Sequence, residues 1–201
     1  MKWTQIRFFI EWDQEGEASK YIDTLLACEV FAKIIDTVGP TFKHWRFHRR
    51  SATDEHGHIF SFNMLCKKGR AKKIDAVVRK HPVVKLLLKG KFITKIVTQR
   101  RKDLTDDSWC KEIRRSWTPM IQGISMMWLS LAREMLNEAL FDISFDRTYE
   151  NLSELTNMYE KLEVKMKETW EQRLSHPILH HIAAVFGQYP MWADVRMPMQ
   201  F

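Results

Sequence analysis

The chain has 201 residues, 45% of them apolar, with 7 glycines and 6 prolines, which predicts one globular domain with or without a helical extension. It contains no stretch of about 18 apolar residues without charges, so we expect no transmembrane helix and no membrane partner. The formal net charge is +7, but residues 67–102 carry 14 basic residues and one acid, whereas the remainder carries 18 basic and 24 acidic residues.

This uneven charge predicts an anionic partner for the basic segment, which would be a nucleic acid, an acidic protein or an acidic peptide. The alternative is a solvated, lysine-rich helix face. The three cysteines, Cys28, Cys66 and Cys110, are far apart and fit no metal-binding spacing. Together with an N-terminus that lacks the features of a signal peptide, they predict a reduced, cytoplasmic protein without structural zinc.

The first half of the chain predicts alternating strands and helices. Residues 3–12 are rich in aromatic and β-branched residues, as strands are, and apolar residues at helical spacing over 21–38 predict a helix that Gly39-Pro40 ends. Residues 41–49 and 59–66 each alternate with period two around a polar loop, which predicts a β-hairpin. In its first strand, one face would carry Trp45 and Phe47, and the other Phe42, His44, Arg46 and His48.

A second helix is predicted over residues 69–80, with an apolar stripe of Ile74, Val77 and Val78. Residues 83–90 fit either a helical turn or an extended link, and residues 91–99 resemble a strand. The resulting order, β-α-β-β-α-β, predicts an α+β protein with a ferredoxin-like fold, in which two helices cover a four-stranded antiparallel sheet. Residues 1–102 would form this domain, with the second and fourth strands at the edges of the sheet.

Residues 103–201 predict a helical extension of three helices. Thr118-Pro119 has the residue types of an N-cap and a first helical position, so the first helix would run from there to about residue 140. Periodic apolar residues predict a second helix over 151–174, and a third would follow from Ser175. The methionines and tryptophans of this half predict core or interface packing, and we expect a partner protein to contact Trp117, Met127, Trp128 and Trp192.

The sequence contains no recognisable catalytic motif, because the nucleophile-elbow, phosphate-loop and dinucleotide-binding patterns are all absent. The histidines His44, His48, His56 and His58 form a group of metal-ligand types. On a strand, His44 and His48 would point the same way but lie about 13 Å apart, too far to share one ion. We therefore expect no catalytic residue, metal or other cofactor in this chain, with a stand-alone metalloenzyme as an alternative.

Nucleic-acid binding is a further alternative, because ferredoxin-like sheets with exposed aromatic residues bind RNA. The predicted first strand carries Phe8, Phe9 and Trp12, and the third carries Phe60 and Phe62. The glycine-rich aromatic signature of the common RNA-recognition module is missing, however. The alternative is thus a small basic protein that binds RNA or DNA through residues 67–102.

Peptide binding is the leading prediction. An edge strand presents unpaired N–H and C=O groups, and an extended peptide can add to it as a further strand. Both predicted edges carry positive charge, which suits an acidic peptide. We expect the peptide to contact the second-strand residues Arg46, His48, Arg49 and Arg50 and the fourth-strand residues Phe92, Thr94 and Lys95.

The stretches HWRFHRRSATDEHGHIFSFNM (44–64) and SWTPMIQGISMMWLSLAREML (116–136), with the basic helix between them, resemble the small partner subunit in methanobactin biosynthesis. The W…FFI…W-x-F-x-R rhythm is also similar to the split peptide-handling domains of lantibiotic and thiopeptide dehydratases. The first resemblance implies a non-catalytic subunit that holds the leader part of a precursor peptide. Its larger heterodimer partner would be an iron-dependent oxygenase, which holds the iron and converts peptide cysteines into oxazolone–thioamide groups with dioxygen.

Overall fold

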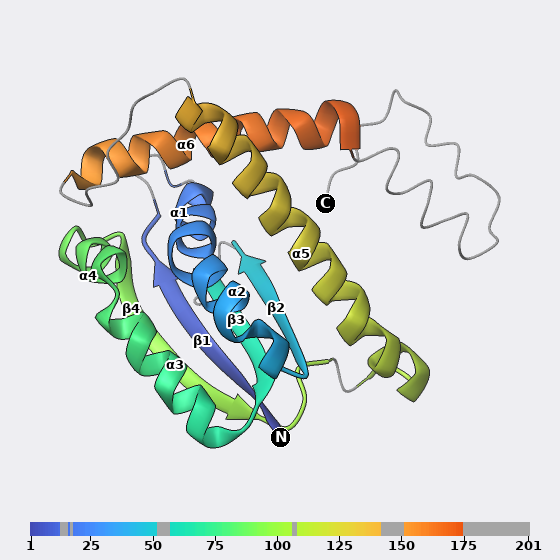
Figure 1. Ribbon diagram of the computed structural model, residues 1–201. Helices are drawn as coiled ribbons and strands as arrows, with labels where there is room; N and C mark the ends of the chain where they lie inside the picture. Colours follow the sequence, from blue (N-terminus) through green and yellow to red (C-terminus); the bar gives the residue numbers. More distant parts are fainter. Residues whose placement is uncertain (13–15, 17, 52–56, 106–107, 142–150, 175–201) are drawn as a thin grey trace. The chain divides into compact units, whose positions relative to one another are not determined.

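The computed structural model describes residues 1–12, 16, 18–51, 57–105, 108–141 and 151–174. Four strands form one antiparallel sheet: β1 (Lys2–Ile10), β2 (His44–Arg50), β3 (His58–Cys66) and β4 (Ile93–Arg101). Their order across the sheet is β2-β3-β1-β4 (Figure 1). The predicted α+β class with a ferredoxin-like sheet is confirmed, and β2 and β4 are its edges as expected.

Alternation along the strands divides the sheet into a covered face and an open face. On the covered face, Phe8 of β1 lies opposite Phe60 of β3, and Phe62 of β3 lies between Ile6 of β1 and Phe47 of β2. All of these side chains are buried, because helices pack against this face. Phe8, Phe60 and Phe62 are therefore core residues and cannot serve as an exposed surface for bases.

One continuous helical segment packs against the covered face. It consists of α1 (Lys20–Leu25), the π-helix η1 (Leu26–Phe31) and α2 (Ala32–Val38), which confirms the helix predicted over residues 21–38. Phe31 is fully buried, and its ring centroid lies 4.5 Å from that of Phe62. The 3-10 turn Gly39–Thr41 follows, and its proline cannot continue an α-helix, so the chain turns there toward β2.

The remaining helices on this face are α3 (Lys68–Lys80) and α4 (Pro82–Lys89). In α3, Ala71, Ile74 and Val78 are buried, whereas Val77 is 54% exposed, so the predicted apolar stripe is wrong at Val77. At about 100° per residue, Ala71, Ile74 and Val78 lie on one helix face, and Val77 lies about 90° from the centre of that face. Residues 83–90, which fitted either a helix or a link, belong largely to α4, since Pro82 is compatible with a first helical turn.

Two strand boundaries differ from the prediction. β4 begins at Ile93, so Phe92, expected in the edge strand, lies in the preceding turn, where its N–H donates to a carbonyl of α4 at 3.0 Å. β2 begins at His44, so Phe42 lies outside the alternating backbone. Its ring centroid lies 6.2 Å from that of Phe62 on the covered face, not on the side it was expected to share with His44. The turns before β4 and β2 set the directions of the Phe92 and Phe42 side chains, and the alternation of residues along a strand does not predict them.

The long helix α5 (Lys111–Phe141) begins before the predicted start and carries Pro119 inside it. The proline removes one backbone hydrogen bond there. The preceding turn is held from outside the helix, because Arg114 donates to the Asp103 carboxylate (2.7 Å) and to Thr105 Oγ1 (3.0 Å). The interpretation of Thr118-Pro119 as a helix start is therefore wrong. Neither α5 nor any other helix in the described part of the chain is apolar enough over its length to cross a membrane.

Residues Met1–Glu163 form one compact unit and Val164–Phe201 a second. The domain boundary expected at residue 102 falls inside the first unit, because α5 packs along β2. The helix α6 (Leu152–Thr169) follows Asn151, whose side-chain oxygen accepts the Ser153 N–H at 3.1 Å, and it continues into the π-helix η3 (Trp170–Leu174). The helix predicted from Ser175 and the expected contact residue Trp192 lie outside the described residues.

Candidate functional site

The open face of the sheet, opposite α1 to α4, is polar and cationic. Its strand residues are Trp3, Gln5, Arg7 and Phe9 (β1), His44, Arg46, His48 and Arg50 (β2), Ile59, Ser61, Asn63 and Leu65 (β3), and Lys95, Val97, Gln99 and Arg101 (β4). Basic residues are frequent among them, whereas aspartate and glutamate are absent. An anion that approaches this face therefore meets no like charge from the strands.

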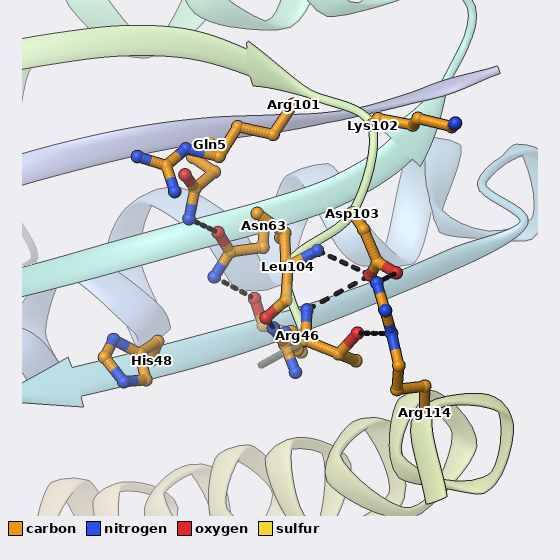
Figure 2. A pocket seen from close by; sticks show the side chains of 10 residues that line it. Gln5, Arg46, His48, Asn63, Arg101, Lys102, Asp103, Leu104 and Arg114 are labelled. Atoms are coloured by element: carbon orange, nitrogen blue, oxygen red, sulfur yellow. Dashed lines mark hydrogen bonds and ion pairs between the residues drawn. The ribbon is translucent and has the colours of Figure 1, made fainter. Parts of the chain in front are cut away.

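A ladder of side-chain amides crosses the middle of the open face, and Figure 2 shows its part from Gln5 through Asn63 to Arg46. Gln99 Nε2 donates to Gln5 Oε1 at 2.8 Å, and Gln5 Nε2 donates to Asn63 Oδ1 at 2.8 Å. Asn63 Nδ2 in turn donates to the carbonyl of Arg46 at 3.5 Å. The ladder thus joins all four strands. The amide NH₂ groups of Gln5 and Gln99, which are partly exposed, each have a second N–H, and the ladder fixes the direction in which that N–H points.

A cavity of about 770 Å³ lies over this part of the face, within the size range of small-molecule sites. It is lined by Gln5, Arg46, His48, Asn63, Arg101, Lys102, Asp103, Leu104, Thr105 and Arg114. One wall is the loop between β4 and α5. Arg46 holds this loop from β2, since its Nη2 donates to Leu104 O at 2.9 Å (Figure 2).

Asp103 is the acidic residue of the cavity wall, and hydrogen bonds from α5 and from the loop compensate its charge. Arg114 Nη2 donates to its Oδ2 at 2.7 Å, and the N–H groups of Leu104 and Thr105 donate to its Oδ1 at 2.7 and 3.1 Å. Partial desolvation opposes ionisation, but these bonds outweigh it and lower the pKa of Asp103 to about 2. The carboxylate therefore stays ionised at neutral pH and orients Arg114 at the rim of the cavity.

Cationic side chains lie over the two aromatic rings of the open face. The Arg46 guanidinium carbon is 5.6 Å from the centroid of the Trp3 ring. Arg7 and Lys95 lie 5.1 and 5.6 Å from the centroid of the Phe9 ring. At exposed sites such contacts contribute about 0.5–1 kcal/mol each. Because this is a small energy, a polyanion that attracted Arg7 and Lys95 would readily uncover the Phe9 ring. Trp3 and Arg46 are both buried, so that pair belongs to the packed part of the face.

The positive charges of the open face destabilise one another. Desolvation, followed by the charges of Arg101 and Arg50, lowers the pKa of Arg7. The pKa of His48 is likewise lowered, first by desolvation of its ring and then by Arg46 and Arg50. Both groups are surrounded by cations, so the electrostatic effects have the same sign. A bound anion would relieve this repulsion, which favours binding.

The residues predicted to bind a peptide are divided between the two faces. Arg46, His48 and Arg50 lie together on the open face, whereas Arg49 points to the covered face. Arg50 Nη1 donates to Gly57 O at 2.9 Å. On β4, Thr94 and Lys95 are exposed, and Phe92 lies in the turn before the strand. Contact of these residues with a peptide stays a prediction, but they do not form one continuous edge.

The outer edge of β2 is capped by α5. Gln122 Oε1 accepts the N–H of Trp45 at 3.4 Å, and Ser125 Oγ accepts the N–H of Phe47 at 3.1 Å. These are the donors that an added strand would use. A peptide can therefore pair with this edge only if α5 moves, which leaves β4 as the edge for strand addition.

The residues expected to contact a partner protein differ in their surroundings. Trp128 packs within the chain, because its ring centroid lies 5.5 Å from that of Phe47 and the Arg49 guanidinium lies 4.7 Å above it. Trp117 is partly exposed, and Met127 is 39% exposed. Trp117 and Met127 are therefore accessible to a partner, whereas Trp128 attaches α5 to β2.

The clustered histidines do not converge on one site. His44 and His48 lie on the open face, and His44 Nδ1 is 3.1 Å from Gln122 Oε1. His58 lies on the covered face, and His56 is outside the described residues. In the described ranges, no group of three or more His, Cys, Asp or Glu side chains is placed to hold a metal ion. Since the sheet separates His58 from His44 and His48, these three histidines cannot share one ion.

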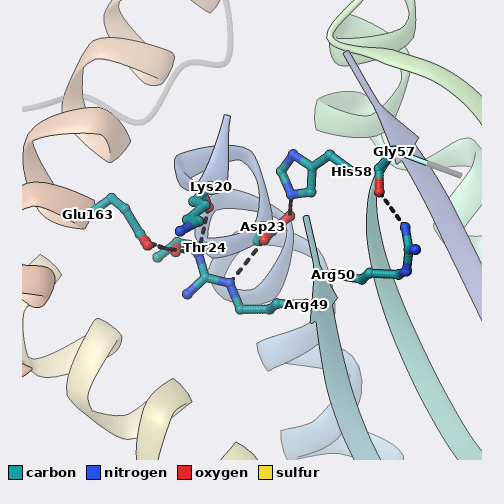
Figure 3. A network of polar contacts seen from close by, with 8 residues as sticks. All are labelled: Lys20, Asp23, Thr24, Arg49, Arg50, Gly57, His58 and Glu163. Carbon is teal, nitrogen blue, oxygen red and sulfur yellow. Dashed lines mark hydrogen bonds and ion pairs between the residues drawn. The ribbon is translucent and has the colours of Figure 1, made fainter. Parts of the chain in front are cut away.

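A buried polar network stabilises the covered face (Figure 3). Asp23 accepts hydrogen bonds from His58 Nε2 and Arg49 Nε, both at 2.9 Å, and the Asp23 and His58 side chains are each 1% exposed. Arg49 Nη2 also donates to Glu163 Oε1 at 2.7 Å. Burial opposes the charge of Arg49, but Asp23 and Glu163 outweigh it and raise the pKa of Arg49. Arg49, expected to bind a peptide, is thus part of a structural network.

Sequence reasoning missed several residues that give the open face its chemistry. Gln5 and Arg7 on β1 and Gln99 on β4 are not in the predicted site. Their signal was available, because Gln5 and Arg7 alternate with apolar residues, as expected of a strand with one polar face. Asp103 and Arg114 lie in segments without clear periodicity, so no pattern predicted that they would line the cavity.

Comparison with known proteins places the chain in no family. No family model matches it, and no curated protein matches it. A similar solved structure is a de novo designed protein with a ferredoxin fold, determined by solution NMR. It is 12% identical, the match covers 55% of this chain and 91% of that chain, and the TM-score is 0.31. A TM-score and an identity this low support no inference from that protein. The fold is therefore assigned from the strand order and register described above.

Proposed function

We propose that the protein binds single-stranded RNA or DNA on the open face of its sheet. The observation that carries this proposal is the charge of that face, from which Arg7, Arg50, Lys95 and Arg101 project while no strand residue is acidic. Phosphate contacts dominate the affinity of proteins for nucleic acids, and arginine binds phosphate through paired hydrogen bonds. The proposed site therefore includes strand residues outside the basic segment 67–102.

The remaining groups of the face suit the bases of a single strand. Phe9 would stack with a base once Arg7 and Lys95 above it bind phosphates, and stacking contributes about 1–3 kcal/mol per base. The partly exposed amides of Gln5 and Gln99 would donate to base edges. A single strand presents its bases to such a surface, whereas a duplex keeps them paired and stacked. We therefore propose single-stranded rather than duplex nucleic acid.

The variant Arg7→Ala/Arg50→Ala/Lys95→Ala should weaken binding of a mixed-sequence, single-stranded oligonucleotide at least about 100-fold, because each substitution removes a charged contact to phosphate. The slope of log affinity against log salt should become shallower by about 2, since about 0.7 of a counterion is released per phosphate contact on a single strand. Fluorescence anisotropy titrations over a range of salt concentrations measure both quantities.

The matched control is Lys68→Ala/Lys72→Ala/Lys73→Ala, which removes the same charge from exposed positions of α3. It should change the affinity and the salt slope much less. If this control instead caused the larger loss, the binding surface would lie on the basic helix. If the unmodified protein did not bind oligonucleotides at low salt, the proposal would be wrong.

Binding should strengthen as the pH falls from about 8 to about 6. Desolvation and the charges of Arg46 and Arg50 lower the pKa of His48, so its ring is neutral near pH 7 in the unbound protein. A nearby phosphate raises that pKa, the complex takes up a proton, and affinity rises as the pH falls toward the pKa of the bound state. In the same titrations His48→Gln should flatten the pH profile, whereas His44→Gln should not. A profile unchanged by His48→Gln would assign the proton to another group.

The second candidate is strand addition of an acidic precursor peptide at β4, within the heterodimer with an iron-dependent oxygenase that the resemblance implies. The capping of β2 by α5 favours it, because β4, with Thr94 and Lys95 exposed, is then the edge available to a peptide. An acidic peptide replacing the oligonucleotide distinguishes the candidates, since addition at β4 depends on Lys95 and not on Arg7 of the central strand. For both candidates we propose a cytoplasmic protein.

A further inference from the structure

The helix α5 carries a second apolar stripe that does not pack on the sheet. Ile113, Met120, Ile124 and Met127 are 49%, 42%, 40% and 39% exposed. Trp117 and Leu131 belong to the same stripe and are partly exposed. From Ile113 to Leu131 these positions alternate between spacings of four and three residues. That spacing is the heptad pattern by which one helix packs against another in a coiled coil.

The stripe is distinct from the side of α5 that packs within the chain. That side carries Ser125, Leu129, Ala132 and Leu136, all of which are buried. At 3.6 residues per turn, the centres of the two sides lie about 130° apart around the helix axis. The contacts that hold α5 against β2 therefore leave the stripe accessible in the described part of the chain, except that the Trp117 ring packs on Trp109, with ring centroids 4.9 Å apart.

Gly123 lies near the middle of α5, beside the stripe. A glycine inside a helix costs about 1 kcal/mol relative to alanine. A Cβ atom at Gly123 would meet no heavy atom within 4 Å, so packing within this chain does not require a glycine there. Close approach of another helix would require it, because the absence of a side chain lets two backbones come near each other. The glycine is thus a second observation that points to a partner helix.

We propose that this stripe binds a second copy of the chain, with the two α5 helices antiparallel and a two-fold axis at the level of Gln122. In this register every apolar residue of the stripe meets another from the second copy: Ile113 meets Leu131, Trp117 meets Met127, and Met120 meets Ile124. Gly123 lies beside Gly123 of the second copy, near the axis. A surface that pairs with itself in this way is what a symmetric dimer needs.

The charges near the end of the stripe favour antiparallel over parallel pairing. Glu134 and Glu138 continue the heptad after Leu131. Parallel pairing would therefore place each carboxylate against the same carboxylate of the second copy. In the antiparallel register, Glu134 lies at the level of the positive N-terminal end of α5 of the second copy. Glu134 and Glu138 are both exposed. The register that pairs the apolar residues therefore also separates these like charges.

Sedimentation velocity of the full chain tests this proposal, which is independent of nucleic-acid binding. We expect a dimer of the 24.0 kDa chain. Ile124→Glu should raise the dissociation constant at least about 30-fold, because it places two carboxylates in the apolar seam. Met126→Glu is the matched control: Met126 is 50% exposed on a different side of the same helix, so this variant should remain dimeric.

Gly123→Gln separates loss of the dimer from loss of the fold. The new side chain has room within the chain and a higher helix propensity, so circular dichroism should show unchanged helix content. The dissociation constant should nevertheless rise, because the side chain separates the two backbones. A chain that stays monomeric at about 100 μM, or a dimer that survives both Ile124→Glu and Gly123→Gln, overturns the proposal. The first result would mean that the stripe binds a different protein. The second would mean that the dimer contact lies elsewhere on the chain.

Discussion

Replacing Asp23 with alanine should lower the free energy of unfolding by about 3–5 kcal/mol, a large part of the stability of an ordinary domain. The Asp23 side chain is 1% exposed and accepts hydrogen bonds from Arg49 and His58 at 2.9 Å. Without the Asp23 carboxylate, Arg49 loses one of the two carboxylates that compensate its charge, and the buried His58 ring loses its hydrogen-bond acceptor. Urea unfolding followed by circular dichroism measures the change.

Asp36→Ala is the matched control for this substitution, because it also removes an aspartate paired with an arginine. Asp36 lies 3.1 Å from Arg133, but the two side chains are 53% and 45% exposed. Exposed pairs contribute roughly 0–1 kcal/mol, so the control should unfold close to the unmodified protein. Equal, small losses for Asp23→Ala and Asp36→Ala would show that the buried network contributes little to stability.

Phe31→Ala should also lower the free energy of unfolding by about 3–5 kcal/mol. The Phe31 ring is fully buried, and its centroid lies 4.5, 5.8 and 6.1 Å from those of Phe62, Phe8 and Phe47. Its removal would leave a cavity between the helical segment and the central strands, since the surrounding rings cannot collapse fully into the space. The same unfolding measurement tests this expectation.

Val77→Ala controls for the loss of an apolar side chain without the loss of core packing. Val77 is 54% exposed, and substitutions at such positions usually change stability by less than about 0.5 kcal/mol. Phe31→Leu should lie between the two, because leucine fills part of the space. A loss below about 1 kcal/mol for Phe31→Ala would contradict the description of this ring as the centre of the core.

Much of the sheet could be predicted because its residues follow simple periods. The alternation in 41–49 and 59–66 predicted the hairpin and placed Trp45 and Phe47 on one side and His44, Arg46 and His48 on the other, as the register confirms. Alternation specifies which residues share a face but not which face a helix will cover. The alternation therefore leaves Phe60 and Phe62 open as candidates for base stacking, whereas in the structure they are buried under helices.

The parts that could not be predicted depend on contacts between distant segments. The earlier start of α5 is stabilised by Arg114 binding Asp103, and an N-cap pattern cannot report such a contact. The cavity on the open face is closed by a short loop whose position depends on Arg46 donating to Leu104 O. The capping of β2 depends on side chains of α5 that belong to a different segment. In each case, hydrogen bonds between distant segments determine what local propensity leaves open.

The capping of β2 also limits how copies of this protein can assemble. A growing fibre of paired strands needs two reactive ends on every subunit, as a polymer needs monomers with two reactive groups. With Trp45 N–H and Phe47 N–H occupied by α5, each sheet offers strand pairing at β4 alone. A subunit with one such end terminates growth after a single pairing. Association through strands alone is thus restricted to pairs.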